Sequence, residues 1–166
     1  NGGADGLGIY FSKGQDKFAP TSYVQDGRLY LDARSTTSSY EHLYFMTGMN
    51  WTNYVVEMDY CEIGANGWIG MLYRVKEPFS FQKTGINFNG ATSLYGFTGT
   101  AAAPQWQHNT AAPNKITQNK VVPTEGEPLR MKIVVNGQSA TLYAARYNAD
   151  GSVNAYQELT SASNLY

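Results

Sequence analysis

Three carboxylates lie within one short segment, Glu57-Met58-Asp59-Tyr60-Cys61-Glu62, at the spacing Glu-x-Asp-x-x-Glu. Grouped carboxylates can accept hydrogen bonds from the hydroxyl groups of a sugar, or they can hydrolyse a glycosidic bond. Retaining hydrolysis needs two carboxyl groups about 5–5.5 Å apart. A bulge between Asp59 and Glu62 would turn all three carboxylates onto one face of a strand. The spacing therefore leaves both sugar binding and sugar hydrolysis open.

Two alternating segments surround these acids, and the alternation predicts two β-strands. In the first, the apolar row is Tyr54, Val56, Met58 and Tyr60, and the opposite row is Val55, Glu57, Asp59 and Cys61. In the second, Ile69, Met71, Tyr73 and Val75 oppose Trp68, Gly70, Leu72 and Arg74. Each apolar row must face a core. If the two strands pair, Glu57, Asp59, Trp68 and Arg74 share one outward face.

Such a face could hold a glycan. Carboxylate and guanidinium groups bind sugar hydroxyls, and aromatic rings stack on the apolar faces of sugar rings. The expected ligand-binding residues are Glu57, Asp59, Trp68, Arg74 and, from the long loop 99–120, Trp106. The structural alternative is a cross-strand ion pair between Arg74 and Asp59, with Trp68 packing at the rim.

The composition restricts the class of protein and of partner. A chain of 166 residues has the length of one domain, and 42% hydrophobic against 15% charged residues excludes a disordered chain. The net charge is -1 and no basic run occurs, so nucleic acid and anionic membrane surfaces are excluded as expected partners. No apolar run reaches the ~20 residues that a membrane span requires. The single cysteine, Cys61, permits no disulfide within the chain.

The rest of the chain also reads as short strands and turns. Many aromatic residues, 17 glycines and the absence of a helical period predict an all-β fold, a two-sheet antiparallel β-sandwich (jelly roll) with little helix. We expect turns at Asp26-Gly27, Asn89-Gly90 and Asn136-Gly137. The segment 76–85, broken by Pro78, is expected to be a connection. The other expected strands are 7–11, 23–24, 29–33, 42–46, 86–88, 94–97, 130–135, 140–147 and 152–159.

The segments DGRLYLDA, MNWTNYVVEMDY, GWIGMLYRV and RMKIVVNGQSATLYAARYNADG follow one another in an order that resembles the concanavalin-A-like, laminin-G-like jelly rolls. Bacterial carbohydrate-binding modules and keto-disaccharide hydrolase-like domains are the most similar of these. The resemblance covers most of residues 23–150. It implies a secreted or cell-surface module that binds a glycan on a concave sheet face, although such folds serve many functions.

The resemblance also implies a closing strand. Jelly rolls of this kind end with a glycine-led strand beside the N-terminal strand, whereas this chain stops at SASNLY. We therefore expect residues 1–166 to be a single sandwich domain, a fragment that lacks its closing C-terminal strand. An edge left open in this way invites strand exchange with another segment or chain. A structural or adhesive role through that edge is the third hypothesis for function.

Two further implications concern chemistry. The spacing Glu-x-Asp-x-x-Glu is similar to the catalytic strand of laminarinase-type β-glucanases, which implies Glu57 as nucleophile, Asp59 as the residue that orients it, and Glu62 as acid/base. Resembling jelly rolls often carry a calcium ion that fixes the N-terminal loop. Asp5 or Asp26, with backbone carbonyls, could supply its oxygen ligands, although turn chemistry beside glycine explains both residues as well.

Overall fold

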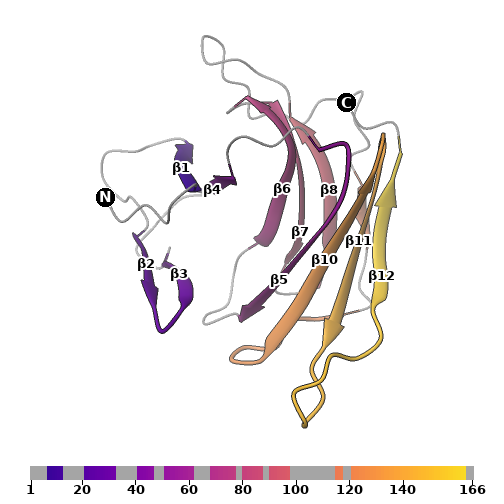
Figure 1. Cartoon of the computed structure of the whole chain (residues 1–166). Helices are drawn as coiled ribbons and strands as arrows, with labels where there is room; N and C mark the ends of the chain where they lie inside the picture. Colours follow the sequence, from indigo (N-terminus) through magenta and orange to yellow (C-terminus); the bar gives the residue numbers. More distant parts are fainter. Residues whose placement is uncertain are drawn as a thin grey trace. The chain divides into compact units, whose positions relative to one another are not determined.

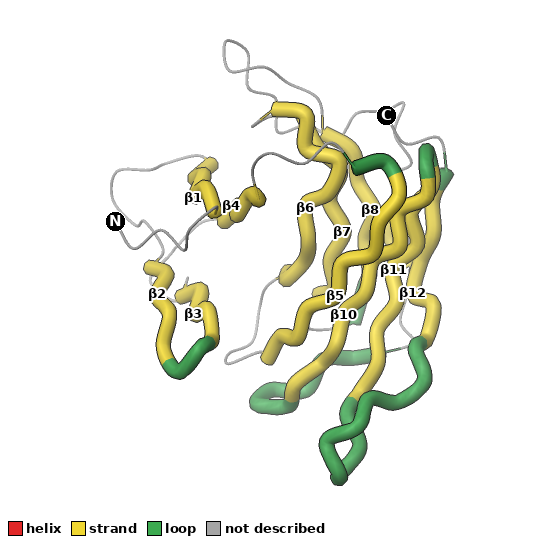
Figure 2. The backbone as a smooth tube through the Cα atoms, in the orientation of Figure 1, coloured by secondary structure: helices red, strands yellow, loops and turns green. Residues whose placement is uncertain are grey.

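A computed structural model describes residues 7–12, 21–32, 41–46, 51–61, 68–77, 80–87, 90–97, 115–117 and 121–163. The contacts divide the chain into two compact units, Asn1–Met49 and Asn50–Tyr166. All regular structure in the described residues is β-strand, and these residues contain no helix (Figures 1 and 2). The all-β class predicted from the sequence is confirmed. The assignment of residues 1–166 to one domain stays a prediction.

The first unit contains two pairs of antiparallel strands. β1 (Leu7–Ser12) pairs with β4 (Glu41–Met46), and β2 (Thr21–Gln25) pairs with β3 (Arg28–Asp32). Asp26 and Gly27 join β2 to β3 with φ angles of 51° and 71°. A two-residue hairpin turn needs positive φ at such positions, and Asp-Gly supplies it. The predicted turn at Asp26-Gly27 is confirmed.

The second unit contains two four-stranded antiparallel sheets. The β5 sheet has the order β12-β11-β10-β5, and the β6 sheet has the order β6-β7-β8-β9. The strands of the β5 sheet are β5 (Asn53–Cys61), β10 (Pro128–Asn136), β11 (Ser139–Arg146) and β12 (Gln157–Ala162). The strands of the β6 sheet are β6 (Trp68–Glu77), β7 (Ser80–Asn87), β8 (Thr92–Phe97) and β9 (Lys115–Thr117).

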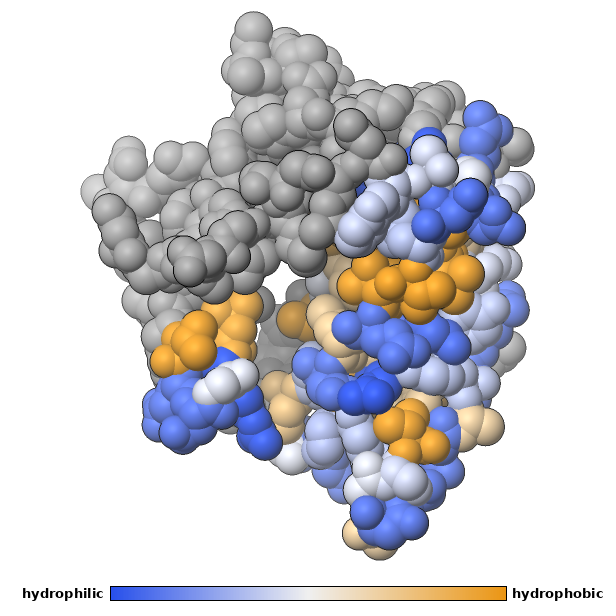
Figure 3. All heavy atoms as spheres, in the orientation of Figure 1, coloured by the Kyte–Doolittle hydropathy of each residue, from blue (hydrophilic) through white to orange (hydrophobic). Residues whose placement is uncertain are grey.

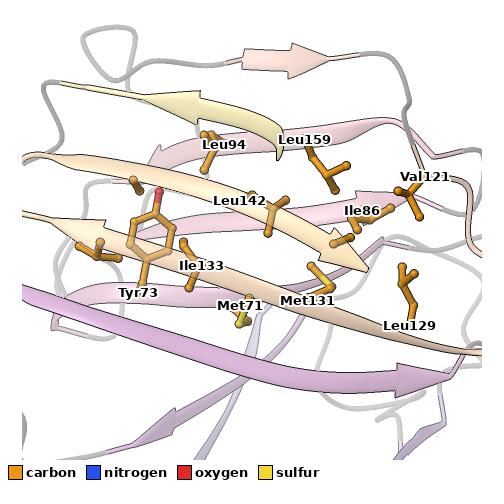
Figure 4. Packing of buried hydrophobic residues seen from close by; sticks show 13 residues of the cluster. Met71, Tyr73, Ile86, Leu94, Val121, Leu129, Met131, Ile133, Leu142 and Leu159 are labelled. Carbon is orange, nitrogen blue, oxygen red and sulfur yellow. The ribbon is translucent and has the colours of Figure 1, made fainter. Parts of the chain in front are cut away.

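The core lies between these two sheets, which therefore form a β-sandwich (Figure 4). The β6 sheet contributes Met71, Tyr73, Ile86 and Leu94, and the β5 sheet contributes Leu129, Met131, Ile133, Val135, Ala140, Leu142, Ala144 and Leu159. On β10 the burial alternates residue by residue, as the sequence predicts for Met131 and Ile133 against Arg130 and Lys132. At one side of the sandwich, β12 lies against β8 and β9.

The hypothesis that the two segments around the acids pair with each other is wrong. β5 pairs with β10, and β6 pairs with β7, so the two segments belong to opposite sheets. The side chains of these rows that the structure describes still lie on the core side, as the alternation predicts: Met71 and Tyr73 are buried, and Tyr54, Met58, Tyr60 and Ile69 pack against the core. Alternation determines which face of a strand is buried, but it contains no information about the neighbouring strand.

Four smaller expectations also need correction. β7 begins at Ser80, inside the segment expected to be a connection, and β9 lies inside the expected long loop 99–120. The turn between β10 and β11 consists of Gly137 and Gln138, one residue later than predicted, with φ 54° at Gly137. β12 extends to Ala162, three residues beyond the expected strand end.

Gly70 and Gly85 face each other across β6 and β7 at a very close approach. A Cβ on Gly70 would overlap the carbonyl oxygen of Thr84 and would lie 2.7 Å from the Cα of Gly85. Because these are backbone atoms, the strands would have to move apart.

We expect Gly70→Ala to lower the free energy of unfolding by about 1–3 kcal/mol, measured by urea denaturation. Gln157→Ala, at an exposed position of β12, is the control; equal stability of both variants would contradict the close approach.

Candidate functional site

The two carboxylates of β5 lie on the outward face of the β5 sheet, beside two cations of β10. In the pairing of β5 with β10, Glu57 is directly opposite Lys132 and Asp59 is directly opposite Arg130. Residues opposite each other in an antiparallel pair point to the same side of the sheet. Tyrosines of β11 and of the segment between β11 and β12 complete the group. We call this group the outward patch; it consists of Glu57, Asp59, Arg130, Lys132, Tyr143, Tyr147 and Tyr156.

Asp59 is held by a two-pronged contact with Arg130. The guanidinium donates hydrogen bonds from Nε to Oδ1 and from Nη2 to Oδ2, each at 2.7 Å. The Tyr147 hydroxyl also donates to Oδ1, and its ring centroid lies 5.5 Å from the guanidinium carbon. The hydrogen bonds from Arg130 are the main reason that the pKa of Asp59 is lowered, and they outweigh its partial desolvation. Asp59 is therefore an anion at neutral pH and no proton donor.

Glu57 and Lys132 form a second group around Tyr156. The Tyr156 hydroxyl donates to Oε1 of Glu57 at 2.9 Å. The ammonium of Lys132 lies 3.6 Å from the centroid of the Tyr156 ring and 5.0 Å from that of Tyr143. An ammonium over an aromatic face is stabilised by the electrons of the ring. Two tyrosines thus position one lysine, and one of them also orients the carboxylate.

The outward patch retains hydrogen-bonding groups for a ligand. A carboxylate offers about four acceptor positions. Within the described residues, hydrogen bonds occupy three of these at Asp59 but only one at Glu57. The ammonium of Lys132 contacts ring faces, and Arg130 uses only Nε and one Nη2 proton toward Asp59. The two anions and two cations of the patch cancel, so it suits a neutral ligand rich in hydroxyl groups.

Arg74 is in a different place from the one predicted. It belongs to β6 in the opposite sheet, where its backbone N donates to the Tyr54 hydroxyl at 3.0 Å and its Nη1 donates to the Gly137 carbonyl. The alternative, an ion pair between Arg74 and Asp59, is also wrong, because the guanidinium partner of Asp59 is Arg130. The shared face expected for Glu57, Asp59 and Arg74 is therefore not formed.

The structure describes the remaining predicted site residues only in part. Trp68 begins β6 opposite Asn87, but its side chain lies outside the described part, as do Glu62 and Trp106 entirely. The catalytic arrangement of the three acids needs a bulge between Asp59 and Glu62. β5 pairs with β10 in continuous register through Cys61, so the described strand has no bulge between Asp59 and Cys61. The catalytic role of Glu57, Asp59 and Glu62 stays a prediction.

The two residues expected to bind calcium are Asp5 and Asp26. Asp5 lies outside the described residues, and Asp26 occupies the hairpin turn between β2 and β3. The described residues contain no group of three or more His, Cys, Asp or Glu side chains that could hold a metal ion. The turn geometry accounts for Asp26, and a calcium site that uses backbone carbonyls with Asp5 or Asp26 stays a prediction.

Five residues of the outward patch were missed: Arg130, Lys132, Tyr143, Tyr147 and Tyr156. The alternation of β10 does place Arg130 and Lys132 on the polar face, but only knowledge of the β5–β10 pairing brings them to the acids. Tyr147 and Tyr156 lie outside the strands: Tyr147 forms an isolated bridge with Val153, Tyr156 follows that bridge, and no periodicity marks either residue. The only usable signal was the high tyrosine content.

Comparison of the chain with protein-family models, with curated proteins and with solved structures finds no match in any of the three. The resemblance to concanavalin-A-like jelly rolls therefore stays a prediction. In the described part of the chain, no helix has both the length and the apolar character of a membrane span.

Tyr156 provides a test of the outward patch. Desolvation and the hydrogen bond to Glu57 raise its pKa from 10.0 to about 12. Because the folded state favours the neutral phenol, this contribution to stability is complete below pH 10 and is lost as the pH rises from 10 toward 12. In Glu57→Gln we expect the pKa of Tyr156 to fall, though not fully to 10.0, since desolvation is the larger cause. A ¹³Cζ tyrosine NMR titration measures it; Glu125→Gln, an exposed turn residue, should leave the pKa unchanged.

Proposed function

We propose that this chain is a non-catalytic carbohydrate-binding module that holds a neutral glycan on the outward face of the β5 sheet. One observation carries the proposal: the outward patch places carboxylates, cations and tyrosine rings side by side on one sheet face. Sugars need this combination, because their ring faces are apolar and their hydroxyl groups are polar. A secreted or cell-surface location, implied by the jelly-roll resemblance, belongs to the same proposal.

Each part of the patch has a role in this binding mode. Glu57 accepts hydrogen bonds from sugar hydroxyls, since most of its acceptor positions are unused in the described structure. Lys132 and Arg130 donate to hydroxyl oxygens, and the tyrosine rings offer faces for stacking. Val55 and Val134, directly opposite each other, add an apolar pair next to the Glu57–Lys132 row. Figure 3 shows apolar and hydrophilic side chains alternating over this face.

Hydrolysis by Glu57, Asp59 and Glu62 is the less favoured alternative. In that mechanism Glu62 would donate the proton and Asp59 would orient the nucleophile Glu57. In the structure Asp59 instead accepts hydrogen bonds from Arg130 and Tyr147. Release of sugar from a bound polysaccharide, abolished in Glu57→Gln, would replace the binding proposal with this one.

We expect Glu57→Ala and Lys132→Ala each to weaken glycan binding by about 10- to 100-fold, the effect of losing a hydrogen bond to a charged group. A glycan array identifies a ligand for the unaltered chain, and isothermal titration calorimetry then measures the variants. Glu125→Ala removes a carboxylate from an exposed turn and is the matched control. Circular dichroism verifies the fold. No binding across the array, or equal affinity of Glu57→Ala and Glu125→Ala, would contradict the proposal.

A second candidate function is assembly through an open sheet edge. Among the described strands, none pairs with the second edge of β5, and Trp51 and Val55 there are exposed. An edge of nine residues without a bulge can accept another strand.

This second function makes a separate prediction. It predicts concentration-dependent oligomers that are reduced in Val55→Lys, because a lysine on an edge strand opposes pairing. Light scattering after size-exclusion chromatography measures the mass. Val122→Lys, which replaces another exposed valine, is the control. A monomer at all concentrations would exclude the assembly.

A further inference from the structure

Two buried polar groups lie opposite each other inside the sandwich. Tyr73 on β6 and Gln82 on β7 are cross-strand partners, and both point into the core, as Met71 and its partner Thr84 do. Each is only 3% exposed. Within the described residues, neither the Tyr73 hydroxyl nor Gln82 Oε1 has a hydrogen-bond partner. Buried polar groups are nearly always paired, so this position calls for a partner.

The chain is bent at the same position. β6 loses its register with β7 between Tyr73 and Glu77, and Arg74 has φ 51°, a strained value for a residue other than glycine. The bend turns the backbone N of Arg74 toward the Tyr54 hydroxyl, 3.0 Å away on the opposite sheet. Bulges and strained residues of this kind are concentrated at binding sites, where they redirect side chains.

The polar groups converge at one end of the sandwich. Tyr54 reaches from β5 to β6, and the guanidinium of Arg74 reaches to the Gly137 carbonyl in the turn between β10 and β11. Figure 4 shows Tyr73 beside Ile133, at one end of the labelled apolar side chains. Burial raises the pKa of Tyr73, and the nearby Tyr54 adds to this, so the hydroxyl is neutral and able to donate.

Two exposed side chains lie along the β5 edge of the sandwich. Val56 lies opposite the fully buried Ile133, on the core side of β5, yet it is 38% exposed. The Trp51 indole, 58% exposed, lies with its ring centroid 6.2 Å from that of Tyr54. An exposed indole beside a half-buried tyrosine is a suitable surface for the apolar face of a sugar ring.

We propose that this end of the sandwich is a second binding site, which takes one hydroxyl group of a polyol or of a single sugar residue between Tyr73 and Gln82. A hydroxyl both donates and accepts: it donates to Gln82 Oε1 and accepts from the Tyr73 hydroxyl. Trp51 and Tyr54 contact the apolar face of the same ligand at the rim. The site shares no residue with the outward patch, so it does not depend on the function proposed for that patch.

The test uses glycerol, D-glucose, D-galactose and D-mannose as probes with the full chain. We expect at least one probe to raise the melting temperature saturably and to shift the ¹³Cζ resonance of Tyr73. Tyr73→Phe and Gln82→Met should each weaken this binding at least 10-fold. Without probe, Tyr73→Phe should be at least as stable as the unaltered chain, because it removes a buried hydroxyl that has no partner. Glu57→Ala, in the outward patch, should retain the effect.

Three results would overturn the proposal. The first is the absence of a saturable response to every probe, with an unchanged Tyr73 resonance in the unaltered chain. The second is equal probe affinity in Tyr73→Phe, Gln82→Met and the unaltered chain. The third is a nuclear Overhauser contact from the Gln82 amide to water that no probe displaces, which would assign the position to a structural water. If a variant does not fold, the shift of the Tyr73 resonance on addition of probe to the unaltered chain decides whether the site binds. Loss of glycan binding in Glu57→Ala, with an intact response here, separates the two sites.

Discussion

The register of β5 against β10 is the constraint on which both sites depend. It sets Val56 opposite Ile133 in the core, and at the same time it sets Glu57 opposite Lys132 on the outward face. A slip by one residue would carry the whole apolar row of β5 to the surface and bury both carboxylates. The burial of Ile133 and Met131 therefore also holds the acids beside their cations. The hydrophobic effect, acting on one face, determines the electrostatics of the other.

The tyrosines between β11 and β12 add the geometry that the register alone does not provide. Tyr147 and Tyr156 each cover a cation of β10 and each donate a hydrogen bond to a carboxylate of β5. Both side chains therefore reach across β10 to the carboxylates of β5. Neither contact need contribute much to stability at an exposed surface, but together they restrict the rotamers of four charged side chains. A ligand then meets groups that are already oriented, which lowers the entropy lost on binding.

Most of the fold, but only two of the seven residues of the outward patch, could be predicted from the sequence. Alternation identified which residues of β5, β6 and β10 face the core, because burial acts on each strand separately. It could not identify the neighbour of β5, since pairing with β6 or with β10 buries the same row. Glu57 and Asp59 were therefore found, whereas Arg130 and Lys132 were missed and Arg74 was placed wrongly.

The most instructive failure is at β7. The presence of Pro78 predicts a connection over residues 76–85, yet β7 begins at Ser80, close behind that proline. Two residues of this strand, Gln82 and Thr84, face the core although their side chains are polar, which no alternation of apolar residues predicts. Thr84 is satisfied by the Ser93 carbonyl at 2.9 Å, whereas Gln82 Oε1 has no such partner in the described residues. Local sequence patterns fail most often where a residue is selected for something other than packing.

The two sites also share one strand, on opposite faces. Glu57 points outward from β5 and Tyr54 points toward the other sheet, and only Val55 and Val56 separate them along the chain. Side chains on alternate faces of a rigid strand have no direct contact, so occupation of one site does not by itself alter the other. Coupling would require β5 to move as a unit. As an edge strand of its sheet, β5 pairs with β10 alone among the described strands, so moving it as a unit would break one ladder of nine residue pairs rather than two ladders.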